Sequence, residues 1–183
     1  EAGLPLDSIA SVASFFVSRI DTNVDNRLQK ILNAGGGHAE KAQSLMGKAA
    51  IASAKLAYKQ HKVVFESDRF LKLAEKGANI QRPLWASTST KNPAYRDVVY
   101  VEELIGPNTV NTMPPHTLKA FLDHGIVAET LEADVDAAQQ TFDDLASIGI
   151  SMDDVTAELL EDGVRAFADS FTELLKSIKA HNN

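Results

Sequence analysis

A chain of 183 residues with an apolar fraction of 44% can bury a sizeable core as one domain. Its formal net charge of −7 argues against binding to nucleic acid or to an anionic membrane, since both attract positively charged surfaces. The absence of cysteine excludes disulfides and thiolate metal sites. No apolar run reaches the length of about 18 residues that spans a membrane. Because the first residues lack a secretory signal and an initiator Met, we expect a cytoplasmic protein whose chain begins inside a longer parent.

The first predicted element is a strand in residues 12–21, an apolar run that is rich in β-branched and aromatic side chains. Alternate side chains of a strand point to opposite faces. One face of this strand would carry Val12, Ser14, Phe16 and Ser18. Both faces are mostly apolar, as in a parallel sheet that is covered on both sides. The pattern predicts a barrel strand with inward hydroxyl groups and with Arg19 close to its end.

Helices are predicted between this strand and the next. Thr22 and Asp25 form a weak capping box that would open a helix, and three glycines at residues 35–37 would end it. Because the glycines follow a helix and not a strand, we interpret them as a flexible connector rather than a phosphate-binding loop. A second helix is predicted over residues 39–61, and a shorter third helix within residues 67–77.

Two further strands are predicted, over residues 83–90 and residues 109–113. Hydroxyl side chains crowd the end of the first of these strands, and two prolines terminate the second. Short helices over residues 98–104 and 117–124 follow them. Three strand–helix units in succession predict a parallel sheet with right-handed crossovers.

The last third of the chain is predicted to be helical. A helix over residues 134–148 precedes a long final helix that Ser151 can cap. We therefore expect one domain over residues 1–183, with the strand–helix units in residues 1–130 and a helical extension in residues 131–183. Apolar side chains recur every three to five positions along the final helix, and we interpret them as core packing. They are Val155, Leu159, Leu160, Val164, Phe167, Phe171, Leu174, Leu175 and Ile178.

Each predicted strand ends in hydroxyl or amide side chains that are followed by a charge or a proline. Ligands of parallel sheets bind at the carboxyl ends of the strands. Arg19 and Lys91 lie beside two of these ends and could bind an anionic group, most simply a phosphate. The alternative for Arg19 is an ion pair with Asp21 or Asp25. The alternative for Lys91 is an ordinary solvated loop lysine.

Other constellations of reactive residues are missing from the sequence. The five histidines are scattered, without the i, i+4 spacing that is typical of metal ligands. No Gly-x-Ser-x-Gly motif is present, so a serine hydrolase has no local signal. The acidic pairs at residues 102–103 and 153–154 would point in different directions on a helix. We predict no metal site, no cofactor and no catalytic carboxylate pair in this chain.

Three blocks of the sequence, residues 13–21, 82–91 and 100–115, closely resemble the carboxyl-terminal half of bacterial transaldolases. The resemblance covers essentially the whole chain. It implies an α/β fold, the (β/α)8 TIM barrel, of which this chain would supply roughly strands six to eight and the carboxyl-terminal helices. The missing amino-terminal half would complete the barrel.

The resemblance also implies a substrate site. Ser14 and Phe16 would lie beside the sugar, and Arg19 would bind its phosphate. Lys91 stands where many family members carry a second phosphate-binding arginine, after a serine that corresponds to Ser89. Because lysine supplies a charge without a bidentate fork, the second phosphate contact differs from that of the family.

Transaldolases transfer a dihydroxyacetone unit between sugar phosphates through a lysine Schiff base, in the pentose phosphate pathway. Sedoheptulose 7-phosphate and glyceraldehyde 3-phosphate give erythrose 4-phosphate and fructose 6-phosphate. In the family this lysine lies upstream of the part that the present chain resembles. Only Lys91 is close to a predicted strand end, and the polar loop behind it does not favour an unprotonated amine. We therefore expect an enzyme whose nucleophile lies outside this chain, and an isolated chain that is inactive.

Three strands cannot close a barrel, which takes about eight, and open edges invite aggregation. We therefore expect two kinds of partner, sugar phosphates and the amino-terminal half of the same enzyme, as the same polypeptide or as a cleaved segment. Two alternatives remain open. One is an enzyme similar to fructose-6-phosphate aldolase, which releases the three-carbon unit to no acceptor sugar. The other is a non-catalytic interaction module that uses the carboxyl-terminal helices.

Overall fold

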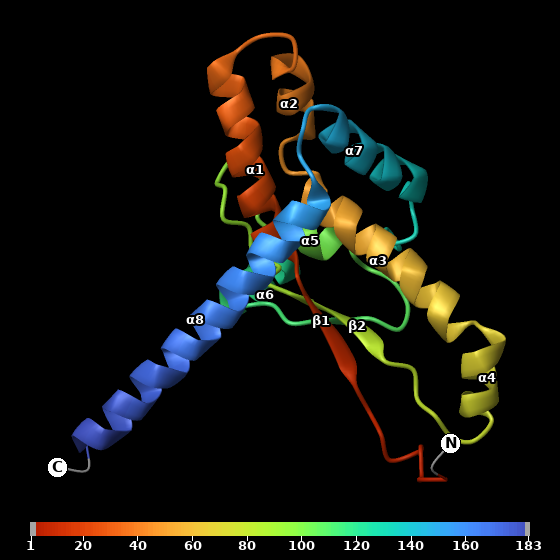
Figure 1. Ribbon diagram of the computed structural model, residues 1–183. Helices are drawn as coiled ribbons and strands as arrows, with labels where there is room; N and C mark the ends of the chain where they lie inside the picture. Colours follow the sequence, from red (N-terminus) through yellow and green to blue (C-terminus); the bar gives the residue numbers. More distant parts are fainter. Residues whose placement is uncertain (1–2, 182–183) are drawn as a thin grey trace.

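The computed structural model describes residues 3–181, and within them it shows three parallel β-strands and eight α-helices (Figure 1). The strands are β1 (Val12–Phe16), β2 (Arg82–Ala86) and β3 (Val110–Asn111). They lie in the order β1-β2-β3, and the register pairs Phe15 with Trp85 and Trp85 with Asn111. The predicted α/β arrangement with a small parallel sheet is therefore confirmed. Within the described residues β1 and β3 each have one unpaired edge.

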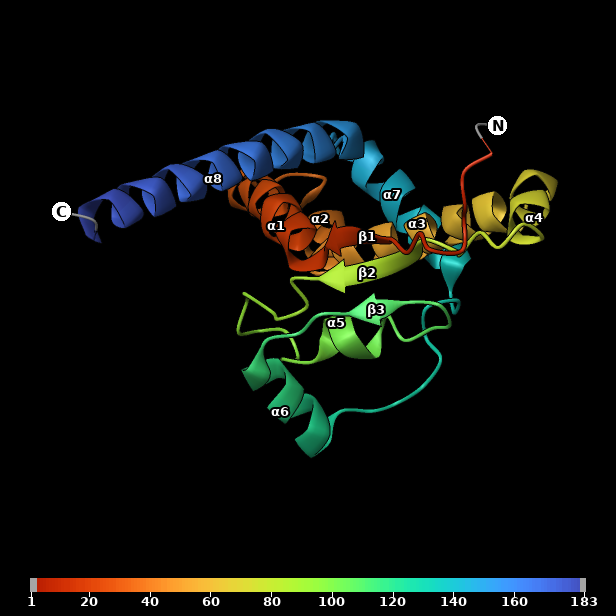
Figure 2. The same ribbon diagram turned by 90° about the horizontal axis from the view of Figure 1, so that it is seen from below.

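The helices surround this sheet unevenly. They are α1 (Val17–Ala34), α2 (Ala39–Leu45), α3 (Ala49–Phe65), α4 (Asp68–Ala74), α5 (Val99–Glu102), α6 (Pro115–His124), α7 (Val135–Ser147) and α8 (Met152–His181). Figure 2 shows α1, α3, α7 and α8 on the β1 side of the sheet, and α6 beyond β3. The main core lies among β1, β2 and the helices α1, α2, α3 and α7, with Trp85 and Tyr100 as its largest fully buried side chains.

Helix α1 begins directly after β1, so the expectation of a strand that continues through residues 17–21 is wrong. The buried side chains of α1 recur at helical spacing, and they are Val17, Ile20, Val24 and Leu28. Residues 17–21 are helical because this spacing continues the apolar face of α1. The expected capping box at Thr22 is wrong for the same reason. Thr22 already lies inside the helix, where its hydroxyl donates to the Ser18 carbonyl at 2.9 Å.

Two glycines decide where the next helices end. Gly35 has a φ of 69° and ends α1 at Ala34, as predicted. The helix that was expected over residues 39–61 is in fact two helices, α2 and α3, because Gly47 separates them with a φ of 71°. Tyr95 packs so closely on Gly47 that a Cβ atom there would lie 2.7 Å from the tyrosine Cζ. Both the backbone conformation and this contact require glycine.

Most of the remaining elements lie near their predicted positions. Helix α4 is capped by Ser67, whose hydroxyl accepts from the Phe70 amide at 3.3 Å. Strand β2 ends at Ala86, four residues earlier than expected, because Ser87 turns the chain with a φ of 55°. Strand β3 is also shorter than expected, whereas α5, α6 and α7 occupy the predicted helical regions.

Helix α8 is present as predicted, but most of its apolar stripe is not core. Val155 is fully buried and Leu159 is half-buried. The other seven residues of the stripe are exposed, and they are Leu160, Val164, Phe167, Phe171, Leu174, Leu175 and Ile178. The expectation of core packing is wrong for these seven. Leu160, Val164 and Phe167 face an open cavity beside β1, and beyond them α8 extends away from the rest of the molecule (Figures 1 and 2). Among residues 3–181 no helix is both long and apolar enough to cross a membrane.

Candidate active site

The carboxyl ends of the strands lie at one edge of the sheet, where two backbone hydrogen bonds connect neighbouring strands and the segments that follow them. Because the strands are parallel, Phe16 at the end of β1 pairs with Ala86 at the end of β2. The Ser18 amide donates to the Ser87 carbonyl at 3.1 Å, and the Thr112 amide donates to the Trp85 carbonyl at 2.9 Å. Of the residues that were predicted to bind substrate, four lie at or beyond this edge, and Ser14 lies two residues before the end of β1.

Ser14, Phe16 and Arg19 line one cavity of about 640 Å³. Arg19 is exposed and lies over the ring of Phe16, with the guanidinium carbon 4.7 Å from the ring centroid. The structure shows no ion pair between Arg19 and Asp21 or Asp25 within residues 3–181. The alternative for Arg19 that the sequence left open is therefore not the arrangement observed. Residues of α8 form the opposite, apolar wall of this cavity: Leu159, Leu160, Val164 and Phe167.

Ser89 and Lys91 form a second group, on the segment that follows β2. Ser89 is buried, and the ammonium group of Lys91 donates to its hydroxyl at 3.2 Å. Lys91 itself is exposed. The neighbouring residue Thr88 is fully buried and donates to the side-chain oxygen of Asn111 at 2.9 Å. This contact connects the segment after β2 to the end of β3.

Lys91 does not share the cavity of Arg19. It lines a smaller one of about 170 Å³, between α1 and the segment that contains Tyr95, and the two cavities have no lining residue in common. Ser18, the neighbour of Arg19 in the chain, lines the smaller cavity and has a buried hydroxyl without a hydrogen-bond partner among the described residues. The five predicted residues therefore lie in two groups. Ser14, Phe16 and Arg19 line the larger cavity, whereas Ser89 is bonded to Lys91, which lines the smaller one.

The smaller cavity contains a carboxylate–tyrosine cluster that the sequence analysis did not identify. The hydroxyl of Tyr100 donates to Asp21 at 2.7 Å, and the hydroxyl of Tyr95 donates to Asp25 at 2.7 Å. Burial raises the pKa of Asp21 to about 6, although the hydrogen bond from Tyr100 opposes this shift. Burial also raises the pKa of both tyrosines, and the nearby carboxylates add to the shift. The i, i+4 spacing of Asp21 and Asp25 was a usable signal, but only for a helix that begins before residue 21.

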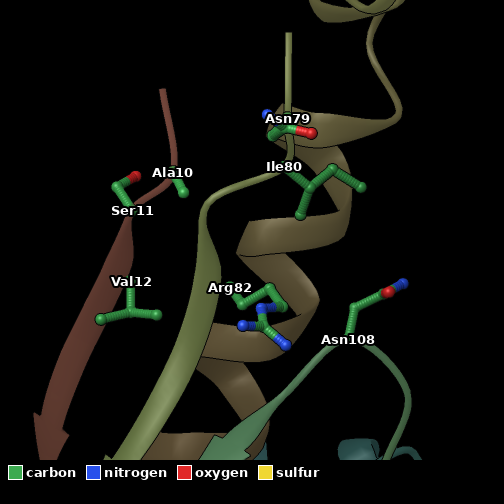
Figure 3. Close-up of a pocket in the computed structure, with 7 residues that line it drawn as sticks. All are labelled: Ala10, Ser11, Val12, Asn79, Ile80, Arg82 and Asn108. Carbon is green, nitrogen blue, oxygen red and sulfur yellow. The ribbon is translucent and has the colours of Figure 1, made fainter. Parts of the chain in front are cut away.

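A third cavity, of about 610 Å³, lies at the opposite end of the sheet (Figure 3). It is lined by Ala10, Ser11, Val12, Asn79, Ile80, Arg82 and Asn108. Val12 and Arg82 are the first residues of β1 and β2, so this cavity is at the amino ends of the strands. It contains none of the predicted site residues. Since ligands of parallel sheets bind at the carboxyl ends, we place the candidate active site at the other end.

The part of the chain that the structure describes contains no group of three or more acidic or histidine side chains that could hold a metal ion. The arrangement at the carboxyl edge instead offers exposed cations, hydroxyl groups and the amino terminus of α1. These groups suit an anionic ligand. The absence of a cofactor stays a prediction.

A parallel sheet with such groups at its carboxyl edge is typical of α/β enzymes that act on small anionic molecules. The sequence matches the family described as Transaldolase/Fructose-6-phosphate aldolase over residues 1–178, and the chain belongs to this family. The resemblance inferred from the sequence is thereby confirmed. Membership of the family implies a TIM-barrel fold, to which the small parallel sheet conforms.

Several curated relatives are named transaldolase. The chain is 53% identical to that of Mycolicibacterium smegmatis over 176 residues, which are 96% of this chain and 46% of the relative. It is 49% identical to that of Mycobacterium tuberculosis strain H37Rv over 183 residues, which are 99% of this chain and 48% of the relative. It is 51% identical to that of Frankia alni over 179 residues, which are 97% of this chain and 47% of the relative. The chain therefore spans about half the length of the curated relatives it matches.

Proposed function

We propose that this chain is the carboxyl-terminal half of a transaldolase and contributes the substrate and phosphate contacts of its active site. One observation carries the proposal. In a chain that shares about half of its residues with proteins named transaldolase, Ser14, Phe16 and Arg19 line one cavity at the carboxyl end of β1. The reaction would be the reversible transfer of a dihydroxyacetone unit between sugar phosphates, as the family resemblance implies.

Each residue has a defined part in this proposal. Arg19 binds the sugar phosphate, and the ring of Phe16 holds the guanidinium of Arg19 by a cation–π contact. Ser14 contributes a hydroxyl group in the same cavity. The Ser89–Lys91 pair contributes a second cation, in place of a bidentate arginine.

The Schiff-base lysine belongs, in this proposal, to a segment outside the chain. Lys91 is exposed and hydrogen-bonded to Ser89, whereas a Schiff-base lysine usually lies in a desolvated pocket or beside another cation. Lys55 is buried, but it lies on α3, donates to the Ala133 carbonyl at 3.1 Å and pairs with Glu103 at 3.5 Å. These contacts support a structural role for Lys55. The isolated chain is accordingly expected to be inactive.

The missing segment also has a structural role in the proposal. Residues 1–183 would form part of a single TIM-barrel domain, with β1, β2 and β3 as its strands six to eight and residues 131–183 as a helical extension. The unpaired edges of β1 and β3, the exposed stripe of α8 and the double length of the relatives support an amino-terminal partner segment. We call this chain together with that segment the assembled enzyme. A cytoplasmic location stays a prediction.

The test is to substitute Arg19 by alanine in the assembled enzyme. A charge-assisted contact to a phosphate contributes roughly 1.5–3 kcal/mol, so Arg19→Ala should raise KM for fructose 6-phosphate by about ten- to a hundredfold. Arg69→Ala is the matched control, because Arg69 is an exposed arginine on α4, away from this edge. Unchanged kinetics for Arg19→Ala would contradict the proposal and leave the non-catalytic interaction module as the remaining hypothesis.

Borohydride trapping with fructose 6-phosphate tests where the Schiff-base lysine lies. It should label the partner segment, and a label on this chain would show that the assignment of the lysine to that segment is wrong.

An enzyme similar to fructose-6-phosphate aldolase is the second candidate, because the description of the matching family includes both activities. The two are separated by the fate of the three-carbon unit. A transaldolase retains it until an acceptor aldehyde arrives. Release of free dihydroxyacetone from fructose 6-phosphate at a rate equal to kcat, without any acceptor, would favour the aldolase.

A further inference from the structure

We propose that Asp21, Asp25, Tyr95 and Tyr100 are positioning residues that hold Lys91 at a fixed place relative to Arg19. The inference rests on the proposed function, because it assumes that both cations bind the phosphate of a substrate. None of the four residues needs to contact the substrate. They act by fixing the segment that contains Ser89 and Lys91 against α1.

Each of the two carboxylates joins three parts of the fold. Asp21 and Asp25 lie one turn apart on α1 and therefore on one face of the helix. One oxygen of each accepts from a tyrosine, and the other accepts from a backbone amide near the start of α3. These amides are those of Ala50, at 2.8 Å from Asp21, and Gly47, at 2.9 Å from Asp25. Each aspartate thus uses both of its oxygens for positioning contacts.

The segment after β2 depends on these contacts because it has no regular structure of its own. No helix or strand is assigned between Ala86 and Val99. Its first residues are fixed by the Ser87 carbonyl and by Thr88. Its last part is fixed by Tyr95 and, just beyond it in α5, by Tyr100. Lys91 lies between these attachment points, four residues before Tyr95. Since α1 also contains Arg19, the tyrosine–carboxylate contacts set the position of one cation relative to the other.

Burial and close packing make this arrangement stiff. Asp21 and Tyr100 are both 2% exposed, so their hydrogen bond is protected from water. The ring of Tyr95 lies against the backbone of Gly47, at a distance that leaves no room for a Cβ atom. The hydroxyl group of Tyr95 can therefore reach Asp25 only because residue 47 is a glycine. The hydrogen bonds and the packing on glycine together fix this segment.

The decisive variant is Tyr95→Phe in the assembled enzyme, because it removes one hydroxyl group and keeps the ring. We expect KM for glyceraldehyde 3-phosphate to rise about three- to tenfold with kcat nearly unchanged, whereas KM for glyceraldehyde, which lacks the phosphate, should not change. Tyr58→Phe is the matched control. The Tyr58 hydroxyl donates to the Pro107 carbonyl at 3.0 Å, far from this segment, so its loss should leave both KM values unchanged.

A double-mutant cycle tests whether Tyr95 acts through Lys91. In the Lys91→Ala background, Tyr95→Phe should have no further effect on KM, because the cation that it positions is gone. An equal effect in both backgrounds, or no effect in either, would overturn the positioning role. An equal rise of KM for glyceraldehyde would overturn it too, since the effect would then not concern the phosphate.

Failure of the positioning role and failure of the proposed function give different results. If Arg19→Ala and Lys91→Ala both raise KM and Tyr95→Phe does not, only the positioning role is wrong. If Arg19→Ala raises KM and Lys91→Ala does not, the positioning role is also wrong, because Lys91 then binds no phosphate. If Arg19→Ala does not change KM, the proposed function itself is wrong, whatever the effect of Lys91→Ala.

Discussion

The guanidinium of Arg19 lies over the ring of Phe16, 4.7 Å from its centroid, although the two residues belong to different elements. Phe16 is the last residue of β1, and Arg19 is in the first turn of α1. The immediate change from strand to helix brings the two side chains together. It also leaves the guanidinium exposed in the cavity that Ser14 and α8 line, free of any ion pair among residues 3–181. A cation held in this way can bind an anion without first losing a carboxylate partner.

Phe16→Leu should therefore weaken phosphate binding without touching the phosphate. An exposed cation–π contact contributes about 0.5–1 kcal/mol, so we expect KM for fructose 6-phosphate to rise about two- to fivefold. Steady-state kinetics of the assembled enzyme measure the effect. Phe16→Tyr keeps an aromatic face and should behave like the wild type. Equal effects of the two substitutions would show that the ring does not act through Arg19.

Asp21 should make the free energy of unfolding depend on pH between about 4 and 6. Its pKa is about 6 in the folded chain because of burial, against 3.8 for the free side chain. The folded state thus binds this proton more tightly, and the stabilisation is fully present below pH 4 and lost as pH rises through 6. The rise of this pKa from 3.8 to about 6 corresponds to about 3 kcal/mol.

The Asp21→Asn variant isolates this effect, since an amide does not ionise. Urea unfolding at several pH values should show the stability of the wild type, relative to the variant, falling by up to about 3 kcal/mol from pH 4 to pH 7. A relative stability that stays constant over this range would contradict the raised pKa. A relative stability that increases would mean that the hydrogen bonds of Asp21 outweigh its burial.

Gly47→Ala should destabilise the chain more than the same substitution at a glycine that has open space around it. Gly36→Ala is the control, because Gly36 also has a positive φ, 92°, but a Cβ atom there would meet nothing within 4 Å. Both substitutions incur a backbone cost of about 1–2 kcal/mol. Gly47→Ala should cost about 1–3 kcal/mol more, because the new methyl group displaces the ring of Tyr95. Equal free energies of unfolding for the two variants would show that Tyr95 moves aside freely.

The sequence was informative where one physical signal acted alone. The existence and the parallel order of the three strands, the end of α1 at the glycine at residue 35 and the short helix after Ser67 all appear as predicted. The prediction failed where the same apolar residues fitted both the two-residue period of a strand and the 3.6-residue period of a helix. Val17 and Ile20 fit a strand that continues from β1, but with Val24 and Leu28 they also form the buried face of α1. Only packing against the core decides between the two.

The carboxylate–tyrosine cluster could not be found from the sequence for a related reason. Asp21 and Tyr100 are 79 residues apart in the chain, and no local pattern connects them. Their contact exists because β1 and β2 pair in parallel and bring the segments after both strands together. For the apolar stripe of α8 the helix was predicted correctly, but its burial was not. The period of a sequence indicates an apolar face and does not show what covers that face.

Alanine substitutions of two valines of α8 test whether the partner segment covers its apolar stripe. Val155 is fully buried where α8 packs on the rest of the chain, whereas Val164, nine residues later on the same helix, is 63% exposed. In the isolated chain, Val155→Ala should reduce the free energy of unfolding by about 1–3 kcal/mol, and Val164→Ala by less than about 0.5 kcal/mol. In the assembled enzyme the cost of Val164→Ala should rise towards that of Val155→Ala, because the proposed partner segment covers it. If Val164→Ala remains without cost there, the partner segment does not reach this part of α8.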